Sequence, residues 1–221
     1  MPLALVGGDE FRPACDSIDR LLLARRPRQP VRILPTAAAA QRPELAARNG
    51  VEHFGRLGAS DVRAVMALDR SSADDAGLAA ELRAAGLIFL AGGDPAHLMA
   101  SLAGSASQYA LEAALGGGAV VAGSSAGAMV LAARMRPPGG DWQPGLGFAA
   151  GVAVLPHHER GGTARAATYR AGLPADLVLL GIDGATAALE DGDGWLVEGR
   201  GGVTVYAADA RRYLSGERFT L

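Results

Sequence analysis

The segment around Ser125 places the strongest constraint on the fold of this chain. An apolar run at residues 120–122 leads into Gly123-Ser124-Ser125-Ala126-Gly127, and a helix-forming run follows over residues 129–134. A Gly-x-Ser-x-Gly sequence between a strand and a helix is typical of a nucleophile elbow, a sharp turn that exposes the serine hydroxyl. Small residues flank the serine because the turn brings backbone segments close together. These five residues alone leave a second reading open, a glycine-rich turn with a capping serine.

Short apolar runs alternate with helical patterns along the first half of the chain. Between the runs, apolar residues recur at a spacing near 3.6, as in Leu78, Leu82 and Ala85. This alternation predicts an α/β fold with a mostly parallel sheet that is covered on both faces. The predicted strands are Leu3–Val6, Val31–Leu34, 62–67, Leu87–Leu90 and 120–122.

The last third of the chain has a different pattern. Its predicted strands cover residues 152–155, 187–189, 195–197 and 203–206, and Asp191-Gly192-Asp193-Gly194 separates two of them. A short Asp/Gly segment between strands predicts a hairpin, and therefore an antiparallel extension of the sheet. We find no repeat or linker, so we expect a single domain over residues 1–221.

Composition excludes several classes of function. The net charge of −2 gives no reason to expect nucleic acid or a membrane as partner. The 221 residues include no lysine, which rules out a lysine Schiff base and a Walker-type phosphate site. Cys15 is the only cysteine, so it forms no intramolecular disulfide, and we expect it to be a small core residue. The sequence has neither a targeting signal nor an apolar run long enough to span a bilayer, which predicts a soluble cytoplasmic protein.

A serine nucleophile needs a base, and histidine is the usual one. Of the four histidines, we expect His53 at the surface or its boundary and His97 in a capping or packing role. His157 and His158 follow an apolar run, where the rim of the sheet is expected. Adjacent strand residues face opposite sides, so only one of the two should reach Ser125. Adjacent histidines are also poorly placed to share one ion, so we predict neither a metal site nor a cofactor.

The oxyanion that forms during acyl transfer needs two hydrogen-bond donors. Gly92-Gly93-Asp94 ends the predicted strand Leu87–Leu90, and a neighbouring parallel strand would bring the Gly93 N–H beside the elbow. With the Ala126 N–H it would form an oxyanion hole. Taken alone, Gly92-Gly93 also fits a plain strand-to-helix turn.

Gly123-Ser124-Ser125-Ala126-Gly127-Ala128 resembles the elbow of the serine peptidase family that contains dipeptidase E and cyanophycinase. Four other segments fit the family in the same order: Leu5-Val6-Gly7-Gly8-Asp9-Glu10-Phe11, Gly92-Gly93-Asp94, Pro156-His157-His158 and Gly181-Ile182-Asp183-Gly184-Ala185-Thr186-Ala187. The resemblance implies a three-layer αβα sandwich like that of class I glutamine amidotransferases, with a flavodoxin-like sheet. It also implies that Ser125 is the nucleophile, His157 the base, and Gly93 with Ala126 the oxyanion hole.

One position departs from the family pattern. The third catalytic residue of the family is a glutamate, and its position here is Gly184. Asp183 is the nearest substitute, although on a strand its side chain would point the other way unless a bulge corrects the register. Asp141 and Glu159 are weaker candidates. A structural hydrogen bond is the alternative role for Asp183.

The resemblance implies a serine exopeptidase or amidohydrolase that cleaves after an N-terminal aspartyl residue of a small peptide. An acidic side chain of that kind needs a cationic partner, so Arg160 and Arg165 are predicted to bind substrate, and Arg170 is a further candidate. Asp94, in the Gly92-Gly93-Asp94 turn, is also predicted to bind substrate. Two alternatives remain. One is a cyanophycinase-like hydrolase of β-aspartyl-arginine peptides, and the other is a non-catalytic homologue that has lost the triad acid. A homodimer is compatible with the alanine-rich helices.

Overall fold

The computed structural model describes residues 3–221, so the first two residues of the expected domain lie outside it. The strands are β1 (Leu3–Val6), β2 (Val31–Leu34), β3 (Val62–Ala64), β4 (Leu87–Leu90), β5 (Val120–Ser124), β6 (Ala132–Met135), β7 (Gln143–Pro144), β8 (Ala149–Pro156), β9 (Val178–Ile182), β10 (Thr186–Asp191), β11 (Gly194–Gly199), β12 (Gly202–Tyr206), β13 (Ala210–Leu214) and β14 (Arg218–Phe219). The α-helices are α1 (Asp16–Arg25), α2 (Pro43–Arg56), α3 (Arg70–Ala73), α4 (Ala76–Arg83), α5 (Pro95–Leu102), α6 (Ala106–Gly116), α7 (Ala126–Leu131) and α8 (Gly162–Arg170). Three short 3-10 helices are η1 (Pro13–Cys15), η2 (Thr36–Ala38) and η3 (His158–Arg160).

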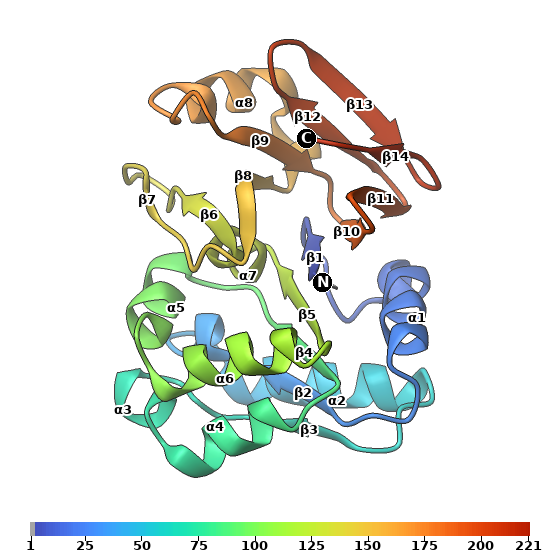
Figure 1. The fold of residues 1–221 in the computed structure, drawn as a ribbon, viewed down its shortest axis with the longest axis vertical. Helices are drawn as coiled ribbons and strands as arrows, with labels where there is room; N and C mark the ends of the chain where they lie inside the picture. The colour runs from blue at the N-terminus through green and yellow to red at the C-terminus, as the bar shows by residue number, and fades with distance from the viewer. Residues whose placement is uncertain (1–2) are drawn as a thin grey trace.

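The strands form two sheets, and Figure 1 shows the parallel strands of the first in the lower part of the molecule and most of the second in the upper part. The first has the order β14-β11-β10-β1-β5-β4-β2-β3. Its strands are parallel to one another from β1 to β3 in this order. The second has the order β13-β12-β9-β8-β6-β7, with parallel pairing of β6 with β8 and of β8 with β9. Parallel strands end at the same edge of a sheet, so the loops that follow β1, β4 and β5 lie side by side at that edge.

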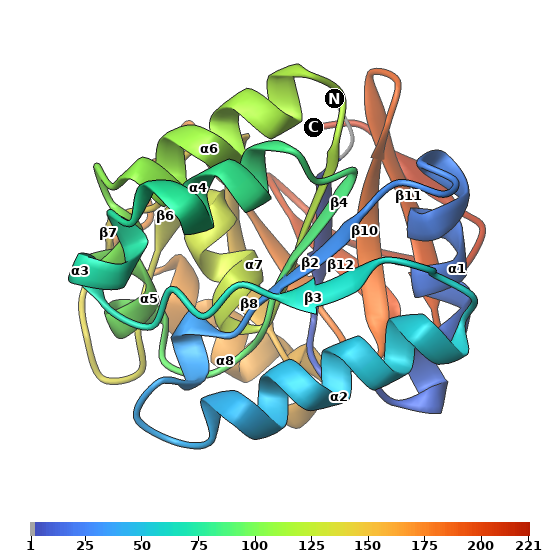
Figure 2. The same ribbon diagram turned by 90° about the horizontal axis from the view of Figure 1, so that it is seen from below.

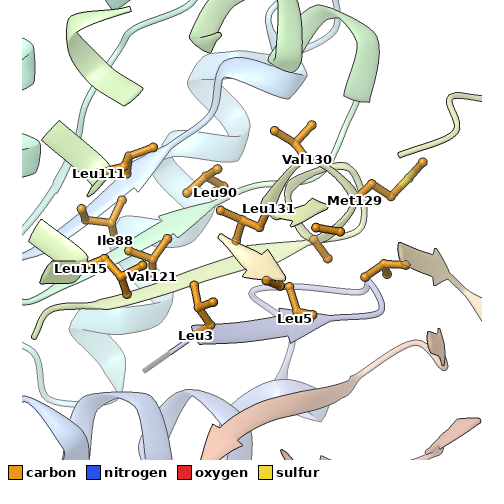
Figure 3. Packing of buried hydrophobic residues seen from close by; sticks show 14 of the residues in the cluster. Leu3, Leu5, Ile88, Leu90, Leu111, Leu115, Val121, Met129, Val130 and Leu131 are labelled. Atoms are coloured by element: carbon orange, nitrogen blue, oxygen red, sulfur yellow. The ribbon is translucent and has the colours of Figure 1, made fainter. Parts of the chain in front are cut away.

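Helices cover both faces of the first sheet. Ile18 and Leu22 of α1 and Phe54 of α2 pack on one face with Val6 and Phe89. Leucines of α4, α5 and α6 pack on the other face, and Figure 2 shows α2 on the opposite side of the strands from α4 and α6. Figure 3 shows this second layer from close by, with side chains of β1, β4, β5, α6 and α7 interlocked. The expected three-layer α/β sandwich with a flavodoxin-like sheet is therefore confirmed.

Local sequence signals explain where several helices begin. Asp94 accepts hydrogen bonds from two backbone N–H groups of α5, and Pro95 takes the first helical position. Asp75 and Ser105 cap α4 and α6 in the same way. Side chains of this kind satisfy donors that the first turn of a helix leaves unpaired.

The second sheet was not anticipated as a separate unit. The predicted hairpin is confirmed, because β10 and β11 pair antiparallel across Asp191 and Gly194. These strands and β14 extend the first sheet, whereas β12 pairs with β9 and β13 in the second. One face of the second sheet joins the same core as α7, and Ala166 of α8 packs on its other face.

Three local expectations are wrong. The helix after Ser125 begins at Ala126 and ends at Leu131, and residues 132–135 instead form β6, because they pair with β8 and β7. The third strand ends at Ala64 rather than at residue 67. His53 is buried, at 3% exposure, where its Nε2 forms a hydrogen bond of 2.7 Å with Oδ2 of the equally buried Asp19 and so has a polar partner without solvent.

None of the helices within residues 3–221 combines the length and the apolar character that a membrane span requires.

We expect Cys15 to be unreactive in the folded protein. It is buried at the end of η1, and burial, reinforced by the nearby carboxylates of Asp19, Glu10 and Asp9, raises its pKa to about 12. Compared with the ordinary value of 9.0, this lowers the thiolate fraction at pH 8 by about 10³-fold. Mass spectrometry after iodoacetamide treatment should find the native protein unmodified and the urea-unfolded protein alkylated once. Equal rates in both states would contradict the burial of this thiol.

Candidate active site

Ser125 occupies a strained turn between β5 and α7. Its backbone has φ 49° and ψ −107°, a conformation that a non-glycine residue adopts only when its surroundings enforce it. The constraint comes from both sides, because the Ser125 N–H donates to Val6 O at 2.9 Å and its carbonyl accepts from Met129 N–H at 3.0 Å. The residue is half-buried. The strand–turn–helix layout predicted from the sequence is present.

The glycines on either side of the elbow are required by close backbone contacts. A Cβ at Gly123 would lie 2.5 Å from the Gly127 carbonyl carbon, and a Cβ at Gly127 would lie 2.5 Å from Leu90 O. Either atom would force the turn apart. The Gly-x-Ser-x-Gly pattern therefore has a steric cause here.

The Gly92-Gly93 turn lies beside Ser125. Leu90 of β4 pairs with Gly123 of β5, and a Cβ at Gly92 would lie 3.4 Å from Ser125 Cβ. Among the hydrogen bonds of residues 3–221, none engages the N–H of Gly93 or of Ala126. Both N–H groups are thus unbonded in the described part of the chain, which is compatible with the predicted oxyanion hole.

Glu10 joins the two turns that border the candidate site, a role that the sequence analysis missed. Its Oε1 accepts from Gly92 N–H at 2.7 Å, and its Oε2 accepts from the Ser124 hydroxyl at 2.7 Å. The side chain follows β1, where Asp9 and Phe11 have positive φ angles of 61° and 62°. The family segment at residues 5–11 was the only signal that pointed to this position.

His157 lies at the end of β8 and is fixed by the loop after β1. Its N–H donates to Gly7 O at 2.9 Å, and its backbone is left-handed, with φ 49°. The imidazole lies against Gly8, where any Cβ would overlap the ring. Its Nδ1 is buried without a hydrogen-bond partner and lies 3.9 Å from Oε1 of Glu159.

His158 points elsewhere. Its Nε2 contacts the Tyr206 hydroxyl at 2.8 Å, and its Nδ1 lies 3.3 Å from Oδ1 of Asp183. Asp183 also accepts from the Gly202 N–H at 2.9 Å and from Arg212 at 2.5 Å. Within residues 3–221, no hydrogen bond or ion pair joins Asp183 to His157. The Asp183 carboxylate belongs instead to a buried network between strands of the second sheet.

The predicted substrate-binding residues lie in different surroundings. Arg160 is exposed and forms ion pairs with Glu159 at 3.2 Å and with Asp9 at 3.6 Å. The Arg165 guanidinium donates to the carbonyl groups of Pro156 and His157, so it supports the turn that carries the histidine. Asp94 caps α5.

Arg170, a further candidate, donates to Ala207 O at 2.9 Å. Within residues 3–221, no group of three or more His, Cys, Asp or Glu side chains could hold a metal ion.

The surroundings of His157 favour its neutral form. Burial lowers the pKa of its imidazole below the ordinary 6.5, and the Arg160 guanidinium lowers it further, while the carboxylates of Glu159, Asp9 and Glu10 oppose this shift. A neutral imidazole at neutral pH is the form that accepts a proton from a serine hydroxyl.

We expect Arg160→Gln to raise the pKa of His157. Removing the guanidinium removes a positive charge that disfavours the imidazolium, so the titration midpoint should move upward toward 6.5. NMR titration of the histidine rings would measure this midpoint in both proteins. Arg48→Gln is a matched control, since Arg48 pairs only with Glu52 on the exposed face of α2. An unchanged or lowered midpoint in Arg160→Gln would refute this electrostatic account.

Glu10→Gln should destabilise the fold and loosen the elbow. A neutral amide has a single acceptor oxygen, so the Gly92 N–H and the Ser124 O–H can no longer each donate to a separate oxygen, and one of the two charge-assisted bonds is lost or reverses its direction. We expect the free energy of unfolding in urea to fall by about 1–3 kcal/mol. Glu112→Gln, which changes an exposed carboxylate on α6 bonded to Gln108, should have little effect. Equal stability of Glu10→Gln and the unsubstituted protein would show that the two bonds contribute nothing.

Comparison with known proteins identifies the family of this chain. The family model described as Peptidase family S51 matches residues 3–193. A cyanophycinase of Trichormus variabilis is 29% identical over 214 residues, which cover 91% of this chain and 72% of that protein. A cyanophycinase of Synechococcus elongatus is 32% identical over 186 residues, which cover 78% of this chain and 57% of that protein.

Two solved structures share the fold. The crystal structure of a peptidase from an acI-B1 Actinobacterium superposes with a TM-score of 0.90 at 28% identity, covering 100% of this chain and 96% of that one. A provisionally named Peptidase E protein from Listeria monocytogenes EGD-e has a TM-score of 0.66 at 16% identity, covering 90% and 98% of the two chains, and supports the fold alone. Since the family model spans most of the sequence, this chain belongs to peptidase family S51, a family of serine peptidases.

Proposed function

We propose that this chain is a serine hydrolase of the exopeptidase or amidohydrolase type, with Ser125 as nucleophile and His157 as base. The observation that carries the proposal is the end of β1, whose successive carbonyl groups bind the backbone of Ser125 and of His157. These bonds hold the backbones of two residues that follow strands of different sheets beside the same end of β1. The strained backbone of Ser125 supports the same conclusion, because strain of this kind concentrates at functional sites.

The chemistry would proceed through an acyl-enzyme. His157 accepts the hydroxyl proton as Ser125 Oγ attacks the carbonyl carbon, and the N–H groups of Gly93 and Ala126 bind the resulting oxyanion. The imidazolium then protonates the leaving amine, and the C–N bond breaks. Water, deprotonated by His157, hydrolyses the ester and regenerates Ser125.

The substrate class follows from family membership and from one exposed cation. We propose peptides with an N-terminal aspartyl residue on the acyl side, as in dipeptidase E. Arg160 is a suitable partner for the acidic side chain, because its guanidinium is 60% exposed and lies three residues after His157. Its ion pairs with Asp9 and Glu159 would have to be exchanged for the substrate carboxylate.

A second candidate substrate is supported by the relatives. Both curated relatives described above are named cyanophycinase, which favours a β-aspartyl-arginine peptide as substrate. The same nucleophile, base and oxyanion donors would serve this reaction. A non-catalytic homologue remains the alternative to both, and Gly184 in place of the family glutamate is the feature that favours it.

The direct test is hydrolysis by the purified protein of Asp-X dipeptides, Asp-p-nitroanilide and β-Asp-Arg. We expect turnover of at least one substrate and a loss of about 10³-fold or more in Ser125→Ala, because the nucleophile is then absent. Ser105→Ala is a suitable control, since its serine caps α6 and takes no part in the chemistry.

A serine-directed phosphonate gives a readout that does not depend on knowing the substrate. We expect a single adduct on Ser125, located by peptide mass spectrometry, and none in Ser125→Ala. Background turnover on every substrate together with no adduct would establish the non-catalytic alternative.

A further inference from the structure

The family glutamate is missing, but other carboxylates lie close to His157, the proposed base. At Gly184, a Cβ would lie 2.5 Å from Oδ2 of Asp9 and 3.3 Å from Oε1 of Glu159. Two carboxylates from other segments therefore occupy the region that a side chain at this position would enter. Gly184 itself has no left-handed backbone requirement, so its identity is not explained by the turn.

Glu159 is held in this region by the backbone of the segment that lost the glutamate. Its Oε2 accepts from the Gly184 N–H at 2.7 Å, across 25 residues of sequence. Its Oε1 is 3.9 Å from the buried and otherwise unpartnered Nδ1 of His157. The short helix η3 places Glu159 two residues after His157, so both ends of this contact come from one turn.

We infer that Glu159 replaces the missing family glutamate as the positioning residue for His157. The inference rests on the proposed function, since a positioning role requires that His157 act as a base. Glu159 Oε1 would accept the Nδ1–H of the imidazole, which leaves Nε2 free to take the Ser125 proton and stabilises the imidazolium. For this role the 3.9 Å separation would have to shorten to hydrogen-bond length when substrate binds, as catalytic hydrogen bonds commonly do.

The other carboxylates of the region fit this role less well. Asp183 is committed to His158, Arg212 and the Gly202 N–H. Asp9 and Glu159 both pair with Arg160, at 3.6 and 3.2 Å, but within residues 3–221 Asp9 has no contact of ion-pair length with His157, whereas Glu159 does. Of the carboxylates around the imidazole, Glu159 also has the largest effect on the pKa of His157.

Glu159→Gln isolates the charge, because a glutamine oxygen can keep the bond from the Gly184 N–H. We expect kcat and the rate of phosphonate labelling to fall by about 10²-fold, whereas KM should not rise, because the substitution also releases Arg160 for the substrate. This is less than the roughly 10⁴-fold loss for a buried triad acid, because the Glu159 side chain is 41% exposed and solvent weakens its charge. Glu44→Gln, which changes an exposed side chain of α2, should behave like the unsubstituted protein.

The titration of His157 separates positioning from a merely structural role. Glu159 raises the pKa of the imidazole, so Glu159→Gln should move the NMR midpoint downward, opposite to the shift expected for Arg160→Gln. Asp9→Asn also removes a negative charge, but it should leave kcat largely intact. A loss in Asp9→Asn that equals the loss in Glu159→Gln would overturn the assignment to Glu159.

Restoring the family glutamate provides the rescue. In Glu159→Gln/Gly184→Glu, the new side chain starts in the same space, where the three atoms nearest to its Cβ belong to the side chains of residues 9 and 159, which can move aside. We expect kcat to recover at least tenfold over Glu159→Gln. Thermal unfolding of each variant checks that it is folded.

The outcomes are distinguishable. An unsubstituted protein that neither turns over substrate nor reacts with the phosphonate overturns the proposed function, and this inference with it. A reactive unsubstituted protein with an equally reactive Glu159→Gln overturns the inference alone. Loss in Glu159→Gln with a lowered His157 midpoint and rescue by Gly184→Glu establishes it.

Discussion

Three carbonyl groups at the end of β1 accept hydrogen bonds from the segments that surround the candidate site. Val6 O binds the N–H of Ser125, Gly7 O binds that of His157, and Gly8 O binds that of Ala185, all within 2.9–3.0 Å. The first bond lies within the first sheet, while the other two reach the segments that follow β8 and β9 in the second. The relative position of the backbones of Ser125 and His157, the proposed nucleophile and base, is therefore set by main-chain hydrogen bonds.

This arrangement explains why the end of β1 is built from glycine. Gly7 lies so close to the carbonyl of Asp183 that a Cβ would overlap it, and Gly8, at φ 137°, lies directly under the His157 ring. The Glu10 carboxylate then joins the two turns that border the candidate site, because it accepts hydrogen bonds from the Gly92 N–H and from the Ser124 hydroxyl. Each of these contacts crosses between segments far apart in sequence, so the site is a product of the whole fold rather than of the elbow alone.

The sequence was sufficient for the elements whose physics is local. The bounds of β1, β2 and β4 agree with the apolar runs, because every residue of these strands is buried. Residues 132–135 form β6 only because β8 lies beside them, a long-range effect that no local pattern contains.

The candidate site likewise combines features that the sequence predicts with features that only the structure shows. The placement of Ser125, His157, Gly93 and Ala126 near one edge follows from motif order, whereas the contact of Glu159 with Gly184 spans 25 residues and needed the structure. Arg165 shows that sequence proximity can also mislead. Its closeness to His157 in the sequence suggested that it binds substrate, yet its guanidinium donates to the backbone carbonyl groups of Pro156 and His157.

A crystal structure of the phosphonate-treated protein tests the central claim most directly. We predict phosphorus on Ser125 Oγ, its oxygen about 2.7–3.1 Å from the N–H groups of Gly93 and Ala126, and the His157 ring between Ser125 and Glu159. Phosphorus on another residue, or an imidazole beyond hydrogen-bond reach of Ser125, would contradict the account.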